Sequence, residues 1–318
     1  MATIVLVHGI AQEDLAADPL EENVWLPALA GGLRNSGYPE LADRIRLSEG
    51  IEVRMAYYGE VFKDPGAMGV GTIDPDTEPL SPDAEALAEQ LARVWLESAV
   101  NAASDPSDRL QGKRELVMLD DDGAEAQGLR SAVGRPALNA LSRIRWFAPF
   151  GMGVGSFVWR ALTQVSRYLT DDDIRSYAQQ QVLDLIEADT RLVIGHSLGS
   201  VVAYEAVHRV VMPAEQELTL VTLGSPLALQ NIVYERLRPQ PPRTPAAVTR
   251  WENFAAEDDL VAARLDLQPY FPPAAGRTVL PISHVVDTGS KPHDVTHYLT
   301  KPSVGRVVAE ALAGMGQA

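Results

Sequence analysis

The sequence predicts an α/β protein whose sheet is open and mostly parallel, with about six strands flanked by helices. Two short apolar runs rich in branched residues, residues 4–7 and 191–194, are typical of strands that are buried on both faces. Helical patterns alternate with such runs near both ends of the chain, and this alternation is typical of parallel sheets. The 318 residues suffice for one domain with a large core.

The residues before position 60 predict a first β-α-β unit. A strand over residues 4–7 leads into the turn His8-Gly9-Ile10, where glycine allows a sharp bend. A helix is expected over residues 21–36, and a second strand over residues 51–58. The helix is indicated by apolar residues near helical spacing, namely Val24, Trp25, Leu29 and Leu33.

Residues 60–165 interrupt this alternation, and we expect them to form a helical cap inserted into a single domain that spans residues 1–318. An amphipathic helix is predicted over residues 83–103. The most apolar stretch, residues 146–162, indicates core packing, with a lid or an acyl-binding surface as the alternative. Its glycines lack the spacing and the preceding strand of a dinucleotide site. The acidic turn at residues 120–125 lacks the spacing of a calcium loop, so no cofactor is expected.

The alternation resumes after residue 169. Thr170 is expected to cap a helix over residues 171–188. Residues 239–245 read as a proline-rich surface linker, and residues 288–297 as a loop after the last strand. The remaining expected elements are strands over residues 218–223, 247–255 and 284–287 and a helix over residues 303–312.

The composition of the chain limits its possible binding partners and its expected location in the cell. The net charge of −16 argues against nucleic acids and anionic membrane surfaces as partners. Cysteine is absent, which excludes disulfides, thiolate catalysis and cysteine-based zinc sites. The first residues lack the pattern of a secretory signal, and no apolar run is long enough to span a membrane. A cytoplasmic location is therefore expected, with membrane contact through residues 146–162 as an unsupported alternative.

The sequence Gly195-His196-Ser197-Leu198-Gly199 lies between the strand at residues 191–194 and a predicted helix over residues 200–211. The pattern Gly-x-Ser-x-Gly alone is weak, since typical residue usage produces it about 0.1 times per sequence of this length. Between a strand and a helix, however, it predicts a nucleophile elbow that exposes the Ser197 hydroxyl at the edge of the sheet. The alternative is a glycine-rich turn without chemistry.

A serine nucleophile needs a base, and the base needs a third group that orients it. Four of the six histidines are excluded by position, and His293 and His297 are left. His8 lies in the turn after the first strand, which is suited to binding the oxyanion, and the His196 side chain is expected to point away from Ser197. His208 lies about three helical turns beyond Ser197, which is too far, and His284 is expected on the last strand. In hydrolases with the chain order Ser…Asp…His the acid lies between serine and histidine on a loop after a strand, and Glu257, Asp258 and Asp259 occupy that position.

Five segments carry a resemblance to a known family: IVLVHGI, LVIGHSLGSVVAYEAV, LVTLGSPLAL, RWENFAAEDDLVA and KPHDVTHYLTKPSV. In them the chain resembles the α/β-hydrolase superfamily, especially the bacterial and glycosylphosphatidylinositol-deacylase-like lipases and esterases. The resemblance implies an α/β-hydrolase fold and leaves residues 60–165 unmatched. The family's aspartate precedes Pro-Val or Pro-Leu, which favours Asp259, before Leu260-Val261, over Asp258. The family's histidine often lies shortly before a Tyr-Leu pair, which favours His293 over His297.

The oxyanion hole is expected to use the backbone N–H groups of Leu198 and Ile10. His293 and His297 lie four residues apart with Asp294 between them, a spacing that on a helix would place two metal ligands on one face, but the segment reads as a loop. No third ligand is evident, so no metal is expected.

The chain is thus expected to be a serine hydrolase that cleaves a small-molecule or lipid-like carboxylic ester through an acyl-enzyme. Ser197 is the expected nucleophile, His293 the base and Asp259 the acid that orients it. An amidase, a peptidase or an acyltransferase on the same triad is the alternative within enzymes. A non-catalytic binding protein that keeps the hydrolase fold is the alternative outside them.

Overall fold

The computed structural model describes residues 2–63, 80–102, 106–121, 154–211, 216–262 and 264–313. The chain divides into two compact units, one formed by Met1–Val61 with Arg175–Ala318 and the other by Phe62–Ile174. The first unit holds the sheet. Most of the acidic turn expected at 120–125, and the first half of the apolar stretch at 146–162, lie outside the described residues.

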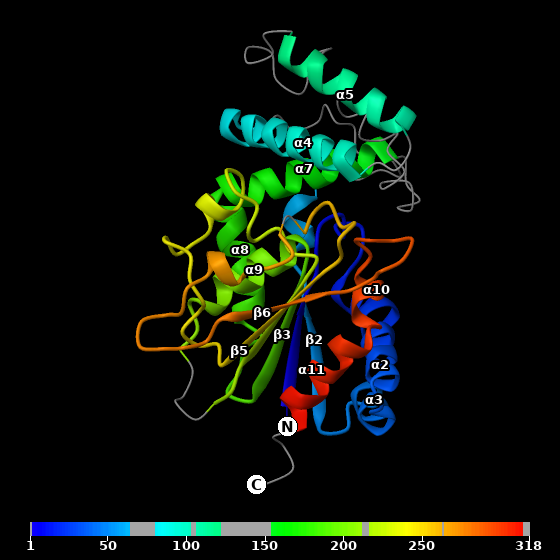
Figure 1. The fold of residues 1–318 in the computed structure, drawn as a ribbon. Coiled ribbons are helices and arrows are strands. Elements are labelled where there is room, and N and C mark those ends of the chain that lie inside the picture. The colour runs from blue at the N-terminus through cyan, green and yellow to red at the C-terminus, as the bar shows by residue number, and fades with distance from the viewer. Residues whose placement is uncertain are drawn as a thin grey trace. The chain divides into compact units, whose positions relative to one another are not determined.

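The first unit is built on an open sheet of six parallel strands in the order β2-β1-β3-β4-β5-β6 (Figure 1). This confirms the α/β fold with a parallel sheet. The chain leaves β1 toward one edge to form β2 and then crosses to the other side of β1 to form β3. In open α/β sheets ligands bind at such a reversal, beside the carboxyl ends of the strands. The strands are β1 (Ala2–Val7), β2 (Ile51–Ala56), β3 (Thr190–His196), β4 (Thr219–Leu223), β5 (Arg250–Ala255) and β6 (Pro281–Val285).

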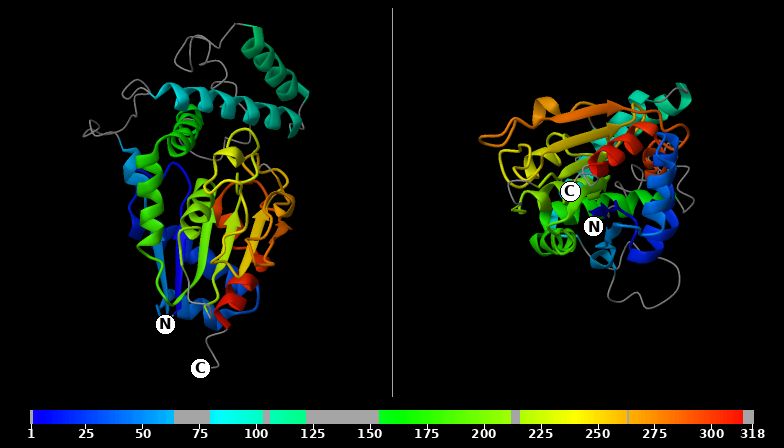
Figure 2. Two further views of the ribbon diagram at one scale, coloured as in Figure 1. Left: turned by 90° about the vertical axis from the view of Figure 1, so that its left-hand side faces the viewer. Right: turned by 90° about the horizontal axis from the view of Figure 1, so that it is seen from below.

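Helices cover both faces of this sheet (Figures 1 and 2). On one face lie α2 (Leu26–Asn35), α3 (Pro39–Arg46) and α11 (Pro302–Ala313). On the other face α9 (Leu198–Val207) packs against β1, β3 and β4, and α8 (Asp172–Leu183) hydrogen-bonds α9 through Gln179 and Glu205. Short helical turns complete the unit: η2 (Gly59–Phe62), η5 (Tyr234–Arg236) and η6 (Gln268–Tyr270).

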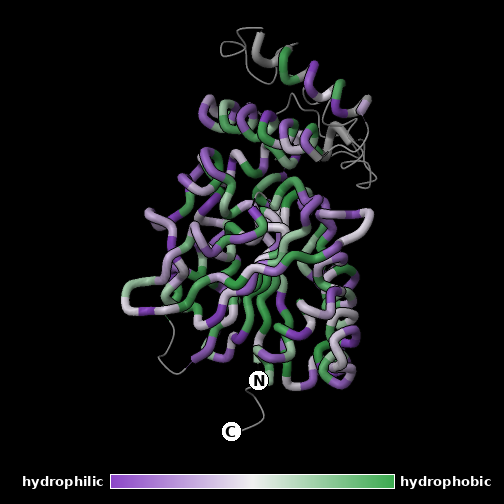
Figure 3. The backbone as a smooth tube through the Cα atoms, viewed as in Figure 1, coloured by the Kyte–Doolittle hydropathy of each residue, from purple (hydrophilic) through white to green (hydrophobic). Residues whose placement is uncertain are grey.

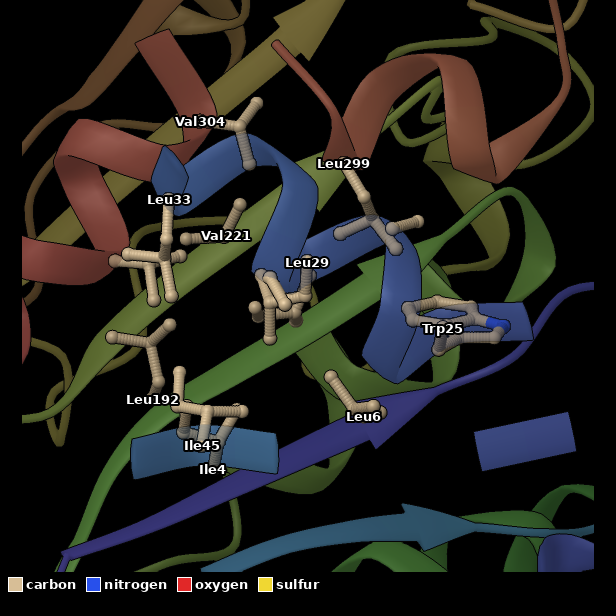
Figure 4. Packing of buried hydrophobic residues seen from close by; sticks show 14 of the residues in the cluster. Ile4, Leu6, Trp25, Leu29, Leu33, Ile45, Leu192, Val221, Leu299 and Val304 are labelled. Atoms are coloured by element: carbon tan, nitrogen blue, oxygen red, sulfur yellow. The ribbon is translucent and has the colours of Figure 1, made fainter. Parts of the chain in front are cut away.

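The core on the α2 side is made by alternate residues of the central strands. Ile4 and Leu6 of β1 and Leu192 of β3 are fully buried against α2 and α3 (Figure 4). Side chains alternate between the two faces of a strand, so β1 and β3 need apolar residues at consecutive positions to cover both faces. The strands in the middle of the sheet are correspondingly hydrophobic along their length (Figure 3).

Several element boundaries differ from expectation. The helix expected at 21–36 begins earlier, as α1 (Ala17–Leu20), continues as a π-helical segment, η1 (Glu21–Trp25), and ends as α2. Helix α3 was not expected. Thr170 does not cap a helix: it ends α7 (Val154–Thr170), and Asp171 caps α8 by accepting from the N–H groups of Asp173 and Ile174.

The segment at residues 239–245 is not a plain surface linker. Thr244 is buried, and the main-chain N–H and C=O of Arg243 both hydrogen-bond the hydroxyl of Tyr204 on α9. Four prolines among seven residues gave the segment a surface character in the sequence, but main-chain groups of Arg243 have partners in the fold.

The second unit contains α4 (Pro82–Ala102), which packs against both α5 (Pro106–Asp121) and α7. The helix expected at 83–103 is confirmed, and its buried stripe contains Leu87, Leu91 and Trp95. Helix α5 was not expected. In the part of the chain that the structure describes, none of the helices combines the length and the apolar character needed to cross a membrane.

Candidate active site

Ser197 lies at a sharp turn between β3 and α9. Its φ of 55° and ψ of −130° place a non-glycine residue in the left-handed half of φ space, at a typical cost of about 1–3 kcal/mol. A Cβ on Gly195 would lie 2.6 Å from the Gly199 carbonyl oxygen, and one on Gly199 would overlap the His8 carbonyl oxygen. Glycine is therefore required on both sides of the serine, because the strand, the turn and β1 approach too closely for a side chain.

The structure brings Ser197, His293 and Asp259 into one hydrogen-bonded chain. His293 Nε2 lies 2.9 Å from Ser197 Oγ, and His293 Nδ1 lies 2.8 Å from Asp259 Oδ2. All three side chains are buried, with exposed fractions of 3%, 5% and 4% in that order. Because a carboxylate only accepts, Nδ1 carries a proton and Nε2 can accept the proton of the serine hydroxyl. This is the orientation in which an imidazole acts as a base toward serine.

Asp259 follows β5, and the turn after it fixes its side chain. Its Oδ1 accepts from the N–H groups of Val261 at 3.0 Å and Ala262 at 3.4 Å. Burial opposes ionisation of this carboxyl, but the charge of His293 and the hydrogen bonds from His293, Tyr298 and Val261 outweigh it and hold its pKa below the ordinary value. Asp258, the competing acid, is exposed, and the His293 imidazole hydrogen-bonds Asp259.

His293 lies on the loop between β6 and α10 (Val295–Leu299). Asp294 caps α10 by accepting from the Thr296 N–H, and the Thr288 hydroxyl donates to the Pro292 carbonyl. His297 lies on α10, not in the expected loop, and its Nδ1 is 2.5 Å from the Thr288 carbonyl oxygen. It therefore braces the loop that carries His293, and Ser197 is contacted by His293 instead.

Two residues of the site were missed in the sequence. Gly224, after β4, has a φ of +52°, and a Cβ there would lie 2.7 Å from Asp259 Oδ2 and 3.1 Å from His293 Nδ1. Tyr298 donates to Asp259 Oδ2 at 2.7 Å. A glycine directly after a parallel strand was a usable signal for the first. In the sequence the Tyr-Leu pair only helps to identify the histidine, and the contact between Tyr298 and Asp259 is visible only in the fold.

Gly9, on the turn after β1, lies against the serine, since a Cβ on it would be 2.9 Å from Ser197 Cβ. The next residue is Ile10, and Leu198 is the first residue of α9, whose N–H has no intrahelical acceptor. The proposed oxyanion donors thus belong to segments on either side of Ser197.

His8 holds the peptide that carries the Ile10 N–H. Its Nε2 faces the Tyr58 N–H at 3.1 Å and must accept, so the proton is on Nδ1, 2.7 Å from the Gly9 carbonyl oxygen. Burial lowers the pKa of His8 to about 4, which keeps this neutral form. The Gly9 carbonyl and the Ile10 N–H belong to one planar peptide. Fixing one therefore fixes the direction of the other.

His196 does not point away from the site as expected. Its ring lies 4.7 Å from that of His293, centroid to centroid. It is buried, burial and the charge of His293 lower its pKa to about 3, and its Nε2 has no hydrogen-bond partner among the described residues. His196 is therefore a neutral ring packed against the base.

Within the described ranges, no group of three or more His, Asp or Glu side chains is arranged to hold a metal ion. His293 and His297 have the separate partners given above.

Comparisons of the chain with protein-family models, with curated proteins and with solved structures found no match. What is shown is thus the α/β fold with its parallel six-strand sheet and the geometry around Ser197.

Proposed function

We propose that this protein is a serine hydrolase that cleaves carboxylic esters through an acyl-enzyme, with Ser197 as nucleophile, His293 as base and Asp259 as the acid that orients it. The observation that carries the proposal is the hydrogen-bonded chain of 2.9 Å and 2.8 Å through the two nitrogens of His293. It begins at a serine in a strained turn at the N-terminus of a buried helix. A glycine-rich turn with only a structural role would need neither the strain nor the partners.

In the proposed reaction His293 Nε2 takes the proton of the Ser197 hydroxyl as Oγ attacks the ester carbonyl carbon. The resulting oxyanion accepts hydrogen bonds from the N–H groups of Ile10 and Leu198. The bond to the leaving alkoxide then breaks, and the imidazolium protonates that oxygen. Water, deprotonated by the same imidazole, attacks the acyl-serine, the imidazolium returns the proton to Ser197 Oγ as the ester bond breaks, and the acid is released. Asp259 stays ionised throughout and stabilises the imidazolium.

For the fold and the substrate class we propose membership of the α/β-hydrolase superfamily and a small-molecule or lipid-like ester. Support comes from the resemblance of the five segments given above and from the parallel sheet. In the folded chain the serine follows β3, the acid follows β5 and the histidine follows β6. All three thus lie beyond the carboxyl ends of parallel strands, where open α/β sheets place their sites.

Covalent labelling with a fluorophosphonate tests the triad without knowledge of the substrate. The wild-type protein is expected to be labelled at Ser197, and Ser197→Ala to give no adduct, because the reagent needs an activated serine. Hydrolysis of p-nitrophenyl esters from acetate to longer acyl chains is expected to fall by about 10⁴-fold or more in Ser197→Ala.

The matched control is Ser200→Ala, which removes a buried hydroxyl three residues away. The Ser200 hydroxyl donates to the Ser197 carbonyl at 2.6 Å and its oxygen can accept from the Ser225 hydroxyl at 2.7 Å, and it is not hydrogen-bonded to His293. An unlabelled, folded wild-type protein would rule the triad out and favour a binding protein. Labelling without cleavage of any ester would keep the triad and point to an amide substrate or an acyl transfer.

A further inference from the structure

Tyr298 links Asp259 to the main chain at the end of β5. It lies on α10 and is fully buried. Its hydroxyl oxygen is 3.0 Å from the Ala256 nitrogen and 2.7 Å from Asp259 Oδ2. A backbone N–H can only donate, so the phenol oxygen accepts from Ala256. The single phenol proton is therefore directed at Asp259.

Tyr298 and His293 donate to the same oxygen of the carboxylate. Oδ2 accepts from the phenol and from His293 Nδ1, while Oδ1 accepts from the two backbone N–H groups of the turn. Each additional donor reduces the charge that the carboxylate directs at the others. The strength of the Asp259–His293 interaction is thus set in part by the phenol.

The phenol is a permanent donor. Burial and the neighbouring charge of Asp259 raise the pKa of Tyr298 far above its ordinary range. It therefore stays protonated over the whole range in which a hydrolase is assayed.

Resting on the triad proposed above, we propose that Tyr298 is a positioning residue, which holds the Asp259 carboxylate against His293 and limits how strongly it attracts the imidazole proton. Without the phenol the full charge of Oδ2 would face His293 Nδ1. The imidazolium would then persist to higher pH, where it cannot accept the serine proton.

Titratable groups of neighbouring elements also lie near the base and near Tyr298. His196, from β3, and Ser197, from the elbow, contact the His293 ring, while Asp258 acts on Tyr298 and Asp294 acts on His196 through their charges. His196 stays neutral above about pH 3, because burial and the charge of His293 lower its pKa to that value. The hydrogen bond from Tyr298 is the contact that Tyr298→Phe removes while these groups stay in place.

The test is the pH dependence of the rate constant for fluorophosphonate labelling of Ser197, measured from pH 5.5 to 9 in wild-type protein and in Tyr298→Phe. Phenylalanine keeps the ring and removes the donor. In Tyr298→Phe we expect the rise of the labelling rate constant at low pH (the low-pH limb of the profile) to shift to higher pH by about 0.5–1 pH unit. The plateau rate should fall roughly tenfold, because the carboxylate is less firmly held.

Tyr204→Phe is the matched control. The Tyr204 hydroxyl is also bonded to the main chain, since it accepts from the Arg243 N–H at 3.1 Å and donates to the Arg243 carbonyl at 2.8 Å. Both of its bonds go to Arg243, outside the triad. Its loss should lower stability and leave the limb where it is. Equal losses of labelling in both variants, with no movement of the limb, would mean that Tyr298 is only structural.

If Tyr298→Phe does not fold, 3-fluorotyrosine at position 298 gives the answer. It keeps both hydrogen bonds and is a stronger donor, so the limb should move to lower pH, and an unmoved limb overturns the proposal. A failure of the triad itself is recognised separately, since the wild-type protein would then not be labelled at any pH. In that case the role of Tyr298 falls with it.

Discussion

His8 touches no reacting atom in the proposed reaction, yet it determines how the Ile10 N–H is presented. The two nitrogens of its ring make different bonds, and asparagine and glutamine each reproduce one of them. The amide nitrogen of asparagine lies near the position of Nδ1 and can donate to the Gly9 carbonyl. The amide oxygen of glutamine reaches the position of Nε2 and can accept from the Tyr58 N–H.

We expect His8→Asn to be labelled by a fluorophosphonate within about threefold of the wild-type rate and His8→Gln to lose roughly 10–100-fold, because a misdirected oxyanion donor costs up to about 10²–10³. Each variant loses one buried hydrogen bond, so their urea midpoints should be similar. Equal labelling rates in the two variants would show that the Gly9 bond does not control the site.

At the residue scale the sequence identified the three residues of the proposed triad, but it could not predict what surrounds them. The residues alone leave three acids and two histidines open, and the family resemblance favours Asp259 over Asp258 and His293 over His297. The hydrogen bonds bring Ser197, His293 and Asp259 together. Gly224 and Tyr298 come from segments 35 or more residues away from Asp259 in sequence. Their contacts arise from the order of the strands, which no local pattern contains.

Among the elements, α2 and α10 meet at Gly32. A Cβ on Gly32 would overlap the Leu299 carbonyl oxygen, whereas a Cβ on the preceding Gly31 would lie 3.5 Å from Thr300 Cγ2, an ordinary contact. Both glycines lie inside α2, where alanine is favoured over glycine by about 0.5–1 kcal/mol. Alanine at either position therefore gives the same gain in helix propensity, but only position 31 has room for the added Cβ.

Gly31→Ala is expected to leave the free energy of unfolding unchanged or to raise it by up to about 1 kcal/mol. Gly32→Ala should lower it by about 1–3 kcal/mol, because α10 must move away. Urea unfolding of the two variants measures the difference. Since α10 also carries Tyr298, Gly32→Ala should slow fluorophosphonate labelling as well, and Gly31→Ala should not. Equal stabilities would mean that α10 shifts at no cost.

The elements that the sequence predicted well are those with a strong local pattern. Strands buried on both faces have continuous apolar runs, and five of the expected strands match β1 to β5 closely. Helix α10 was missed because its residues Val295–Leu299 make only about one turn and its neighbours read as loop. Thr170 was chosen as a cap because threonine is a good one, but the preceding helix extends through it.

For the whole molecule, buried histidines should make stability strongly dependent on pH. Burial lowers the pKa of His8, His196 and His208 to about 4, 3 and 4, below an unfolded value of about 6.5. Their contribution is present above pH 6.5 and is lost as the pH falls toward 4, because only the unfolded chain then binds the protons. Glu21 acts in the opposite direction: burial raises its pKa to about 7, so its contribution is lost as the pH rises from about 4.5 to 7.

Between pH 5 and 6 the three histidines outweigh Glu21, so these four groups should together take up roughly two protons on unfolding. The free energy of unfolding, measured in urea, should then rise by about 2.7 kcal/mol per pH unit. His208→Gln should lower the number of protons taken up on unfolding by about one, because glutamine does not titrate. The fold should be kept, since glutamine can still donate to the Arg243 carbonyl that His208 Nε2 contacts. Glu21→Gln should raise the number of protons taken up on unfolding by about one, because the Glu21 carboxyl releases a proton on unfolding where each histidine binds one. A flat stability profile from pH 5 to 6 would show that the buried rings are protonated in the folded protein, which contradicts the neutral His8 on which the direction of the Ile10 peptide depends.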